Sequence, residues 1–232
     1  NESNSIKASY NRNYQYIHLL SNSVSTSPTD VYVPTSNVVK PQIADQVAVG
    51  YFTNLNKDMF EVSVEFYYKW LQNQIDYRNG ADLILNSTVE SELVFGKGRS
   101  YGAELLVRKN TGKLTGWFSY TLSRALRTFD DINGGAEFPA RQDRIHDLSL
   151  TLMYQLTPRL VLSGNFVYYT GDAVTFPSGS YDFDGFVVPY YTERNGYRFP
   201  DYHRLDLGLT YDLKDRKRWK HSLNLSCYNV YG

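Results

Sequence analysis

Cysteine, methionine and long apolar runs are scarce in this chain. It contains one cysteine and two methionines in 232 residues. Because Cys227 is alone, an internal disulfide framework is excluded, and we expect it to be a small apolar residue of a strand. No run of about 18 apolar residues occurs, so the sequence predicts no transmembrane helix.

An excess of charge and the signatures of common enzymes are also missing. Lys and Arg together number 24, as do Asp and Glu, so the chain has no net charge to attract nucleic acid in bulk. It has no Gly-x-Ser-x-Gly motif, and residues 182–185 resemble only the opening of a calcium loop. We therefore predict no enzyme activity, no catalytic residue, no cofactor and no nucleic-acid partner.

Alternating apolar and polar residues are what the chain has in abundance, together with 21 tyrosines. Residues 59–70 show the pattern most clearly. Since strand side chains alternate between two faces, one face is apolar and the other is charged. The apolar face carries Phe60, Val62, Val64, Phe66, Tyr68 and Trp70, and the polar face carries Glu61, Ser63, Glu65 and Lys69. Similar tracts recur at 113–123, 147–156, 159–170 and 204–213.

The length of these tracts and of the breaks between them favours a membrane wall. A strand that crosses a bilayer at a tilt needs roughly 9–11 residues, whereas soluble strands most often have about 5–6. Long breaks alternate with short ones, as in a barrel with tight turns at one end. The sequence predicts an all-β, antiparallel transmembrane β-barrel meander of about nine strands, near 4–20, 44–55, 58–77, 99–110, 113–127, 143–156, 159–170, 200–213 and 219–231.

Specific words in the sequence add a family resemblance. Taken together they resemble the C-terminal part of TonB-dependent outer-membrane receptors of the Bacteroidetes type, over nearly the whole chain. The words are ASYNRNYQY at 8–16, KPQ at 40–42, EFYYK at 65–69, IDY at 75–77, YGAEL at 101–105, GWFSYTLS at 116–123, DRIHD at 143–147 and YNVY at 228–231.

The resemblance implies a role in nutrient import. Such a receptor is a 22-stranded barrel in the bacterial outer membrane, filled by an N-terminal plug, that takes up a siderophore, cobalamin, haem or glycan with energy from an inner-membrane TonB complex. We expect residues 1–232 to be the C-terminal barrel part, with the plug domain and earlier strands absent from this chain. Its expected partners are outer-membrane lipid, its own plug and remaining strands, the TonB complex through that plug, and a surface lipoprotein.

Two groups of residues are candidates for contacts inside such a receptor. Those on the polar faces are expected to face the lumen or the plug, or alternatively only water in a wide interior. They are Glu61, Glu65, Glu104, Arg108, Arg204 and Asp206. The loop 171–199 combines aromatic rings with arginine and is the first candidate for ligand contact, although it can equally be a self-packed loop. Its candidates are Phe176, Tyr181, Phe183, Tyr190, Tyr191 and Arg194.

Two alternatives stay open at this point. Asp143, Arg144, His146 and Asp147, with the similar set Asp201, His203, Arg204 and Asp206, fit a metal site less well than an ion-pair lattice on the lumen side. The other alternative concerns the whole chain, which can instead be a soluble or surface-exposed β-sheet module that binds glycans. Such a module has to bury Phe60, Val64 and Leu207 in a dry core.

Overall fold

One antiparallel sheet forms most of the molecule. The computed structural model describes residues 4–20, 31–81, 86, 89–213, 219 and 221–232. The sheet has ten strands, nine of which follow one another as neighbours, while β8 (Phe138–Pro139) pairs with β7 alone. The nine are β1 (Asn4–Gln15), β4 (Gln42–Leu55), β5 (Phe60–Tyr77), β6 (Leu93–Lys109), β7 (Leu114–Phe129), β9 (His146–Thr157), β10 (Leu160–Tyr169), β15 (Tyr202–Asp212) and β16 (Ser222–Cys227).

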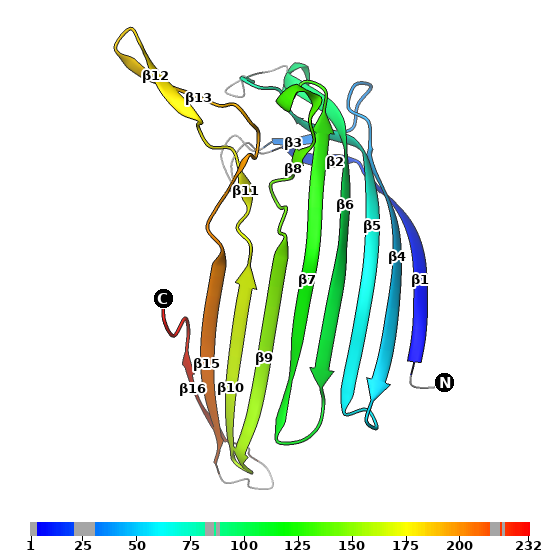
Figure 1. Ribbon diagram of the computed structural model, residues 1–232, viewed down its shortest axis with the longest axis vertical. Helices are drawn as coiled ribbons and strands as arrows, with labels where there is room; N and C mark the ends of the chain where they lie inside the picture. Colours follow the sequence, from blue (N-terminus) through cyan, green and yellow to red (C-terminus); the bar gives the residue numbers. More distant parts are fainter. Residues whose placement is uncertain (1–3, 21–30, 82–85, 87–88, 214–218, 220) are drawn as a thin grey trace.

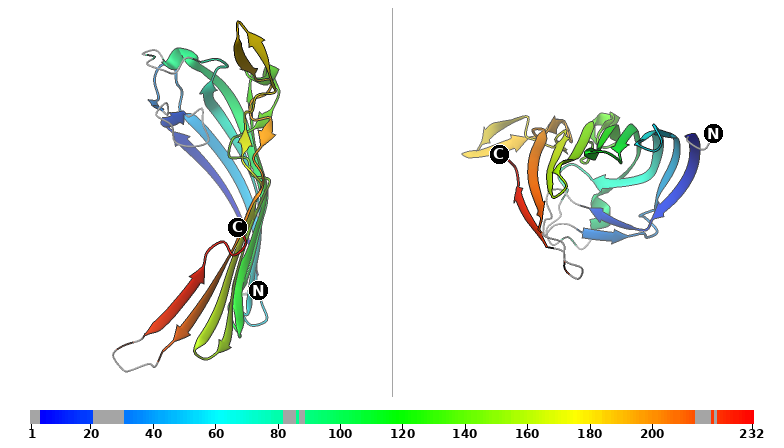
Figure 2. Two further views of the ribbon diagram at one scale, coloured as in Figure 1. Left: turned by 90° about the vertical axis from the view of Figure 1, so that its left-hand side faces the viewer. Right: turned by 90° about the horizontal axis from the view of Figure 1, so that it is seen from below.

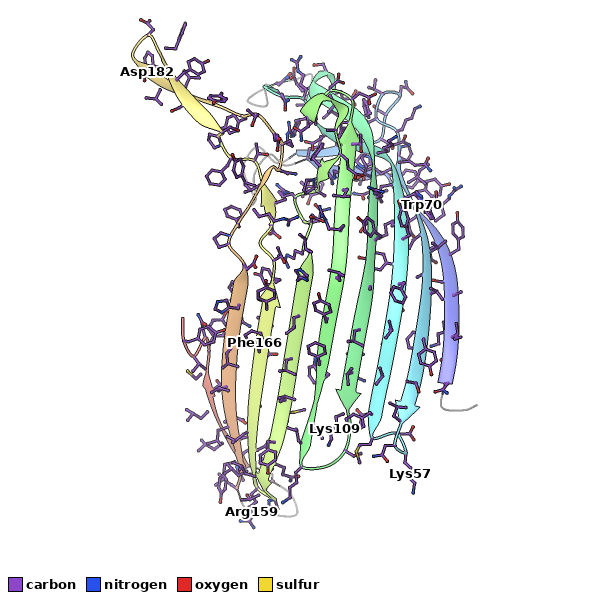
Figure 3. All side chains as sticks on the ribbon, viewed as in Figure 1. Lys57, Trp70, Lys109, Arg159, Phe166 and Asp182 are labelled. Carbon is purple, nitrogen blue, oxygen red and sulfur yellow. The ribbon has the colours of Figure 1, made fainter. Side chains whose placement is uncertain are left out.

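The sheet curves into an open wall with two different ends (Figures 1 and 2). Tight connections join β4 to β5, β6 to β7 and β9 to β10 at one end, here called the turn end, where Lys57, Lys109 and Arg159 lie (Figure 3). The longer connections lie at the opposite end, here called the loop end (Figure 1). The predicted nine-strand meander is therefore confirmed, together with the alternation of its connections.

Short strands and helical turns lie at the loop end. The hairpin of β2 (Ile17–Leu20) and β3 (Val31–Pro34) is followed by the single turns η1 (Val89–Glu92) and η2 (Asn133–Gly135). The connection from β10 to β15 contains the pair β11 (Ala173–Val174) and β14 (Tyr197–Arg198), and the hairpin of β12 (Gly179–Phe183) and β13 (Phe186–Tyr190). This second hairpin projects beyond the wall, with Asp182 near its tip (Figures 1 and 3).

The strand register gives the wall one apolar and one polar face. Directly paired residues of neighbouring strands lie on the same face of a sheet. One row across β5 to β15 is apolar throughout: Val62, Val107, Phe118, Leu150, Phe166 and Leu205. The adjacent row points to the opposite face and is mostly polar: Glu61, Arg108, Trp117, Thr151, Asn165 and Asp206. The alternation read from single strands thus holds across the sheet.

Nothing in the described structure covers the apolar face of the wall. Phe66 is 55% exposed and Leu207 is 46% exposed. The two buried apolar clusters lie instead at the loop end, around Ile75 and around Phe129. The dry core that the soluble-module alternative required of Leu207 is therefore absent from the described residues. In that same part of the chain, no helix has the length and apolarity needed to cross a membrane.

Three predicted tracts had a boundary wrong by more than three residues. The tract 4–20 is not one strand, because β1 ends at Gln15 and β2 leaves the wall to pair with β3. The tract 219–231 forms a strand only as far as Cys227, since Asn229 adopts a positive φ of 51° and donates its backbone N–H to Asp206. The tract 99–110 begins earlier, at Leu93. Of the predicted breaks, residues 21–30, 82–85, 87–88 and 214–218 lie outside the described residues, as does residue 220 of the predicted tract 219–231.

Candidate functional site

A large cavity opens on the polar face at the loop end of the wall. Its volume is about 1200 Å³. Its wall side is formed by alternate residues of three neighbouring strands, namely Tyr67, Lys69, Leu71, Ser100, Ser123, Ala125 and Arg127. These residues belong to the polar face, because Lys69 pairs directly with Ser100, and Ser100 with Ala125. The polar face is therefore the one that encloses space, and we take it as the lumen side.

Arg194 fixes the far side of this cavity. Its guanidinium donates to Asp76 Oδ1 at 2.7 Å, to the backbone oxygen of Tyr77 at 3.0 Å and to Asn79 Oδ1 at 2.9 Å. Its backbone N–H donates to Asn133 Oδ1 at 2.8 Å. Arg194 thus ties the connection 170–201 to the end of β5 and to η2. That Arg194 contacts a ligand stays a prediction. Most of its N–H donors already make hydrogen bonds within the protein.

Asp143 is the centre of a second, buried attachment. It is fully buried and accepts the backbone N–H of Ala125 at 2.5 Å. Arg124 lies 3.3 Å from its carboxylate, and Arg198 also pairs with it. Arg198 donates in addition to the backbone oxygen of Asp143 at 2.5 Å. This ion-pair cluster joins β7 to β14, which supports the lattice interpretation of Asp143 over the metal interpretation.

Only part of the predicted aromatic site faces the cavity. Tyr190, Tyr191 and Arg194 line it, whereas Phe176, Tyr181 and Phe183 are not among its lining residues. Tyr181 and Phe183 lie on the hairpin β12–β13 instead, on one face shared with Phe186, Val188 and Tyr190. Phe183 and Phe186 are 67% and 73% exposed, whereas Phe176 and Tyr197 of the same loop form an edge-to-face pair with ring centroids 6.4 Å apart.

A match to a protein family shows to which class of protein this sheet belongs. Residues 1–230 match the family described as TonB dependent receptor-like, beta-barrel. The chain belongs to this family. The predicted resemblance to TonB-dependent receptors is thereby confirmed, and so is the prediction that the chain is not an enzyme, because the family is one of receptors. Among curated protein sequences, none matches the chain at a significant level.

Solved structures of three receptors share the fold. The Ferric-Catecholate import receptor Fiu from K12 E. coli has a TM-score of 0.61 at 18% identity, and covers 100% of this chain and 29% of its own. The ferripyoverdine receptor of the Pseudomonas aeruginosa outer membrane has a TM-score of 0.64 at 14% identity, and the match covers 100% of this chain and 27% of that receptor. The FrpB iron transporter from Neisseria meningitidis has a TM-score of 0.60 at 16% identity, and the match covers 100% of this chain and 33% of that transporter. The TonB-dependent receptor chain described here therefore spans about a third or less of the length of these proteins.

The predicted lumen residues of the receptor wall all lie on its polar face, but they differ in their partners. Glu61 and Arg108 form an ion pair at 3.2 Å, and Arg204 pairs with Asp206 at 3.1 Å along one strand. Glu65 and Glu104 are direct cross-strand partners, so two carboxylates stand opposite one another. No ion pair to either is present in the part of the chain that the structure describes.

Two histidines of the predicted lumen lattice lie on the other face. His146 pairs in register with Leu122, and His203 with Tyr168, which places both on the apolar face. Each makes a hydrogen bond to a tyrosine hydroxyl: Tyr120 with His146 at 2.8 Å and Tyr231 with His203 at 2.9 Å. Their placement in the lumen lattice was wrong, because a one-residue offset moves a strand side chain to the opposite face. The described residues contain no group of three potential metal ligands.

His18 is the least satisfied polar side chain of the receptor's loop end. It lies in β2, lines the cavity and is 1% exposed, and neither ring nitrogen has a hydrogen-bond partner among the described residues. Burial lowers the pKa of His18, because desolvation disfavours the charged imidazolium. The pKa of His18 is lower in the closed hairpin than in the open one, so the open hairpin binds a proton more readily. Protonation of His18 therefore favours opening. The stability contributed by neutral His18 is present above the ordinary histidine pKa of about 6.5 and is lost below it.

We therefore expect the hairpin β2–β3 to open more readily as the pH falls from about 7 to 5. Amide hydrogen exchange of residues 31–33, corrected for the intrinsic effect of pH, measures this opening. The variant His18→Leu should remove the pH response, whereas His221→Leu, which changes an exposed histidine outside the hairpin, should leave it intact. An unchanged response in His18→Leu would assign the pH dependence to another group.

Sequence reasoning missed the cationic residues on the wall side of the cavity. Lys69 was assigned to the polar face but not to a site, and Arg127 and Arg141 were not singled out. Arg127 lies on β7, two residues beyond Ala125 and near the end of the strand. The alternation predicted which face Lys69 and Arg127 occupy, but only the registration of β5, β6 and β7 brings these two residues to one cavity, while Arg141 lines it from the connection between β8 and β9.

Proposed function

We propose that the chain forms part of the wall of an energised outer-membrane receptor that imports a scarce nutrient. The observation that carries this proposal is the family match over residues 1–230 on a sheet with one apolar and one polar face. The nutrient classes are a siderophore, cobalamin, haem or a glycan. Iron complexes are favoured among them, since the named relatives are a ferric-catecholate receptor, a ferripyoverdine receptor and an iron transporter.

The proposal includes a direction in the membrane. The apolar face contacts lipid, with the turn end in the periplasm and the loop end outside the cell, because outer-membrane barrels have short periplasmic turns and longer external loops. An aromatic group on the apolar face near the loop end supports this placement: Tyr68 lies 4.6 Å from Trp70 and 5.9 Å from Tyr101, measured between ring centroids. Tyrosine and tryptophan favour the membrane interface. We also propose that the receptor is of the Bacteroidetes type and that it has a surface lipoprotein as a partner.

The test of this function uses cells that carry the full-length gene. Growth is compared on limiting iron-siderophore complex, cobalamin, haem or glycan, with and without the gene and with and without a working TonB. We expect the receptor in the outer-membrane fraction, and growth on one nutrient that needs both the gene and TonB. Recovery of the receptor in the soluble fraction, or growth independent of the gene on all four nutrients, would contradict the proposal.

The opposed carboxylates of Glu65 and Glu104 are proposed to hold the plug. Like charges placed directly opposite each other on a sheet repel. A cationic side chain of the plug that binds between the two carboxylates would relieve this repulsion. Glu61 offers no such site, because Arg108 already neutralises it. This difference provides a variant and a control within the same pair of strands, β5 and β6.

We expect the double variant Glu65→Gln, Glu104→Gln to keep the wall intact and to loosen the plug. Loss of two charge-assisted contacts, each about 1.5–3 kcal/mol, should increase entry of a bulky antibiotic that an occupied barrel excludes. Glu61→Gln should leave antibiotic entry near the wild-type level. Equal entry in both variants would remove Glu65 and Glu104 from the plug contact.

A further inference from the structure

We propose that the aromatic face of the hairpin β12–β13 packs against the external end of the receptor wall that continues beyond β16. This inference rests on the proposal that the chain is one part of a longer receptor wall. It gives the hairpin a role as a contact that joins two parts of the same barrel outside the membrane.

The hairpin β12–β13 has one distinctly aromatic face. The strand register places five side chains on it, here called the ring face: Tyr181, Phe183, Phe186, Val188 and Tyr190. The other face carries Ser180, Asp182, Val187 and Pro189. Three rings of the ring face are more than half exposed, those of Tyr181, Phe183 and Phe186. A contiguous exposed apolar surface of this kind marks a site of interaction with another protein surface.

The hairpin is an ordered element that is held at both of its ends. At its base, the backbone N–H of Ser178 donates to the backbone oxygen of Tyr190 at 2.9 Å, and the N–H of Thr192 donates to Ser178 Oγ at 3.2 Å. At its tip, Asp184 and Gly185 have positive φ values of 49° and 80°. Two such residues form the tight turn that suits the twist of a two-stranded hairpin. The rings are therefore presented on a formed surface.

The direction of the hairpin indicates what lies against it. It projects past β15 on the side of β16 (Figures 1 and 2). Within the described residues, β16 is the last strand of the sheet and pairs only with β15. Because backbone groups at an open edge find no water in lipid, another strand of the receptor has to lie along β16. The chain spans 33% or less of each matched receptor, so a full-length receptor has further wall for this position.

The length of the hairpin is sufficient to reach this neighbour. Each of its strands has five residues, which span about 17 Å at about 3.3 Å per residue. Neighbouring strands of a sheet are about 4.8 Å apart. The hairpin can therefore extend over about three strand positions counted from β15, which are β16 and the two positions beyond it.

The charges of the hairpin favour the receptor's own wall over a second copy of the chain. Asp182 and Asp184 lie near the tip, and no basic residue occurs between Arg159 and Arg194. A two-fold contact between copies brings the same surface of each copy together, and would place these acids close to one another. We therefore expect the covering surface to be apolar, with a lysine or arginine opposite the two acids.

The test is the rate at which single cysteines react with a charged maleimide in the purified, monomeric full-length receptor, after every other cysteine has been replaced by alanine. Phe186→Cys places a thiol on the ring face, and Val187→Cys places one on the other face. Phe186 is 73% exposed and Val187 is 69% exposed, so an uncovered hairpin would give similar rates. We expect the thiol at position 186 to react at least tenfold more slowly than the thiol at position 187.

A second pair of variants tests whether the rings hold the contact. Phe183→Asp, added to Phe186→Cys, should raise the rate at position 186 at least fivefold, because it places a charge within the ring face. Ser180→Ala, added to Phe186→Cys, changes the other face and should alter that rate less than twofold.

Three results would overturn the inference. Similar rates at positions 186 and 187 in the monomer would show that the ring face is uncovered, and slow reaction at both would show that the cover does not select the ring face. Protection found only in a dimeric fraction, or only in cells before purification, would assign the contact to a second copy or to another protein. Growth and fractionation of cells test the uptake function separately, so an exposed ring face in a working receptor would remove this contact and leave the function standing.

Discussion

Replacing Leu207 by arginine should prevent most of the receptor from assembling in the membrane. Leu207 is 46% exposed on the apolar face of β15, between Gly164 and Cys227 of the neighbouring strands. A basic side chain on the lipid face costs about 2–4 kcal/mol at the bilayer midplane. The measurement is the fraction of full-length receptor that resists extraction from outer membranes and keeps its heat-modifiable mobility on a gel.

Two substitutions on the polar face control for this effect. Ser226→Arg introduces the same charge beside Cys227, the cross-strand partner of Leu207, but directs it to the lumen side. Asp206→Asn removes a lumen charge and keeps an acceptor for the N–H of Asn229. Both should assemble at more than half the wild-type level. Equal damage from Leu207→Arg and Ser226→Arg would mean that the two faces have been assigned wrongly.

Replacing Asp143 by alanine should release the connections at the loop end. The substitution leaves Arg124 and Arg198 without their shared carboxylate and the Ala125 N–H without its acceptor. Removal of one partner from a buried ion pair costs about 3–5 kcal/mol, and we expect about 3, since both arginines keep some contact with water. Local opening should become roughly 100-fold more frequent, because each 1.4 kcal/mol is a factor of ten.

Amide hydrogen exchange around Ala125 and Arg198 in the full receptor measures this opening. Asp172→Ala is the matched control, because it breaks the half-exposed pair with Arg144, which is worth about 1 kcal/mol or less. Its exchange should stay within a few-fold of the wild type. If both variants opened to the same extent, burial of Asp143 would not be what stabilises the cluster.

Most of the wall was predictable from the sequence, since each of its strands carries its own signal. Strict alternation marks β5 over residues 60–70, and the turn residues Asn56, Lys57 and Asp58 all adopt positive φ values between 52° and 64°. Local chemistry of this kind needs no knowledge of distant contacts. The order of the strands followed from the short connections between neighbours.

The loop end was not predictable in the same way, because its structure depends on contacts between distant residues. Arg194 bonds to Asp76, which lies 118 residues earlier in the chain, and no local pattern indicates that pair. The aromatic residues of 171–199 indicated an exposed loop correctly, but they did not reveal that Phe183 would lie on a projecting hairpin and Tyr190 on the cavity. The cations of the cavity become a group only once the strands are registered.

The contrast between the two faces of β10 is the central claim, and it can be measured directly. Nitroxide labels are attached at single cysteines replacing Asn165, Phe166, Val167 and Tyr168 in the full-length receptor, after Cys227→Ala removes the native thiol. Lipid-soluble oxygen should relax the labels at 166 and 168 strongly and those at 165 and 167 weakly, whereas a water-soluble nickel complex should show the reverse. Labels at 166 and 168 that neither reagent reaches would place the apolar face in a dry protein core and contradict the account.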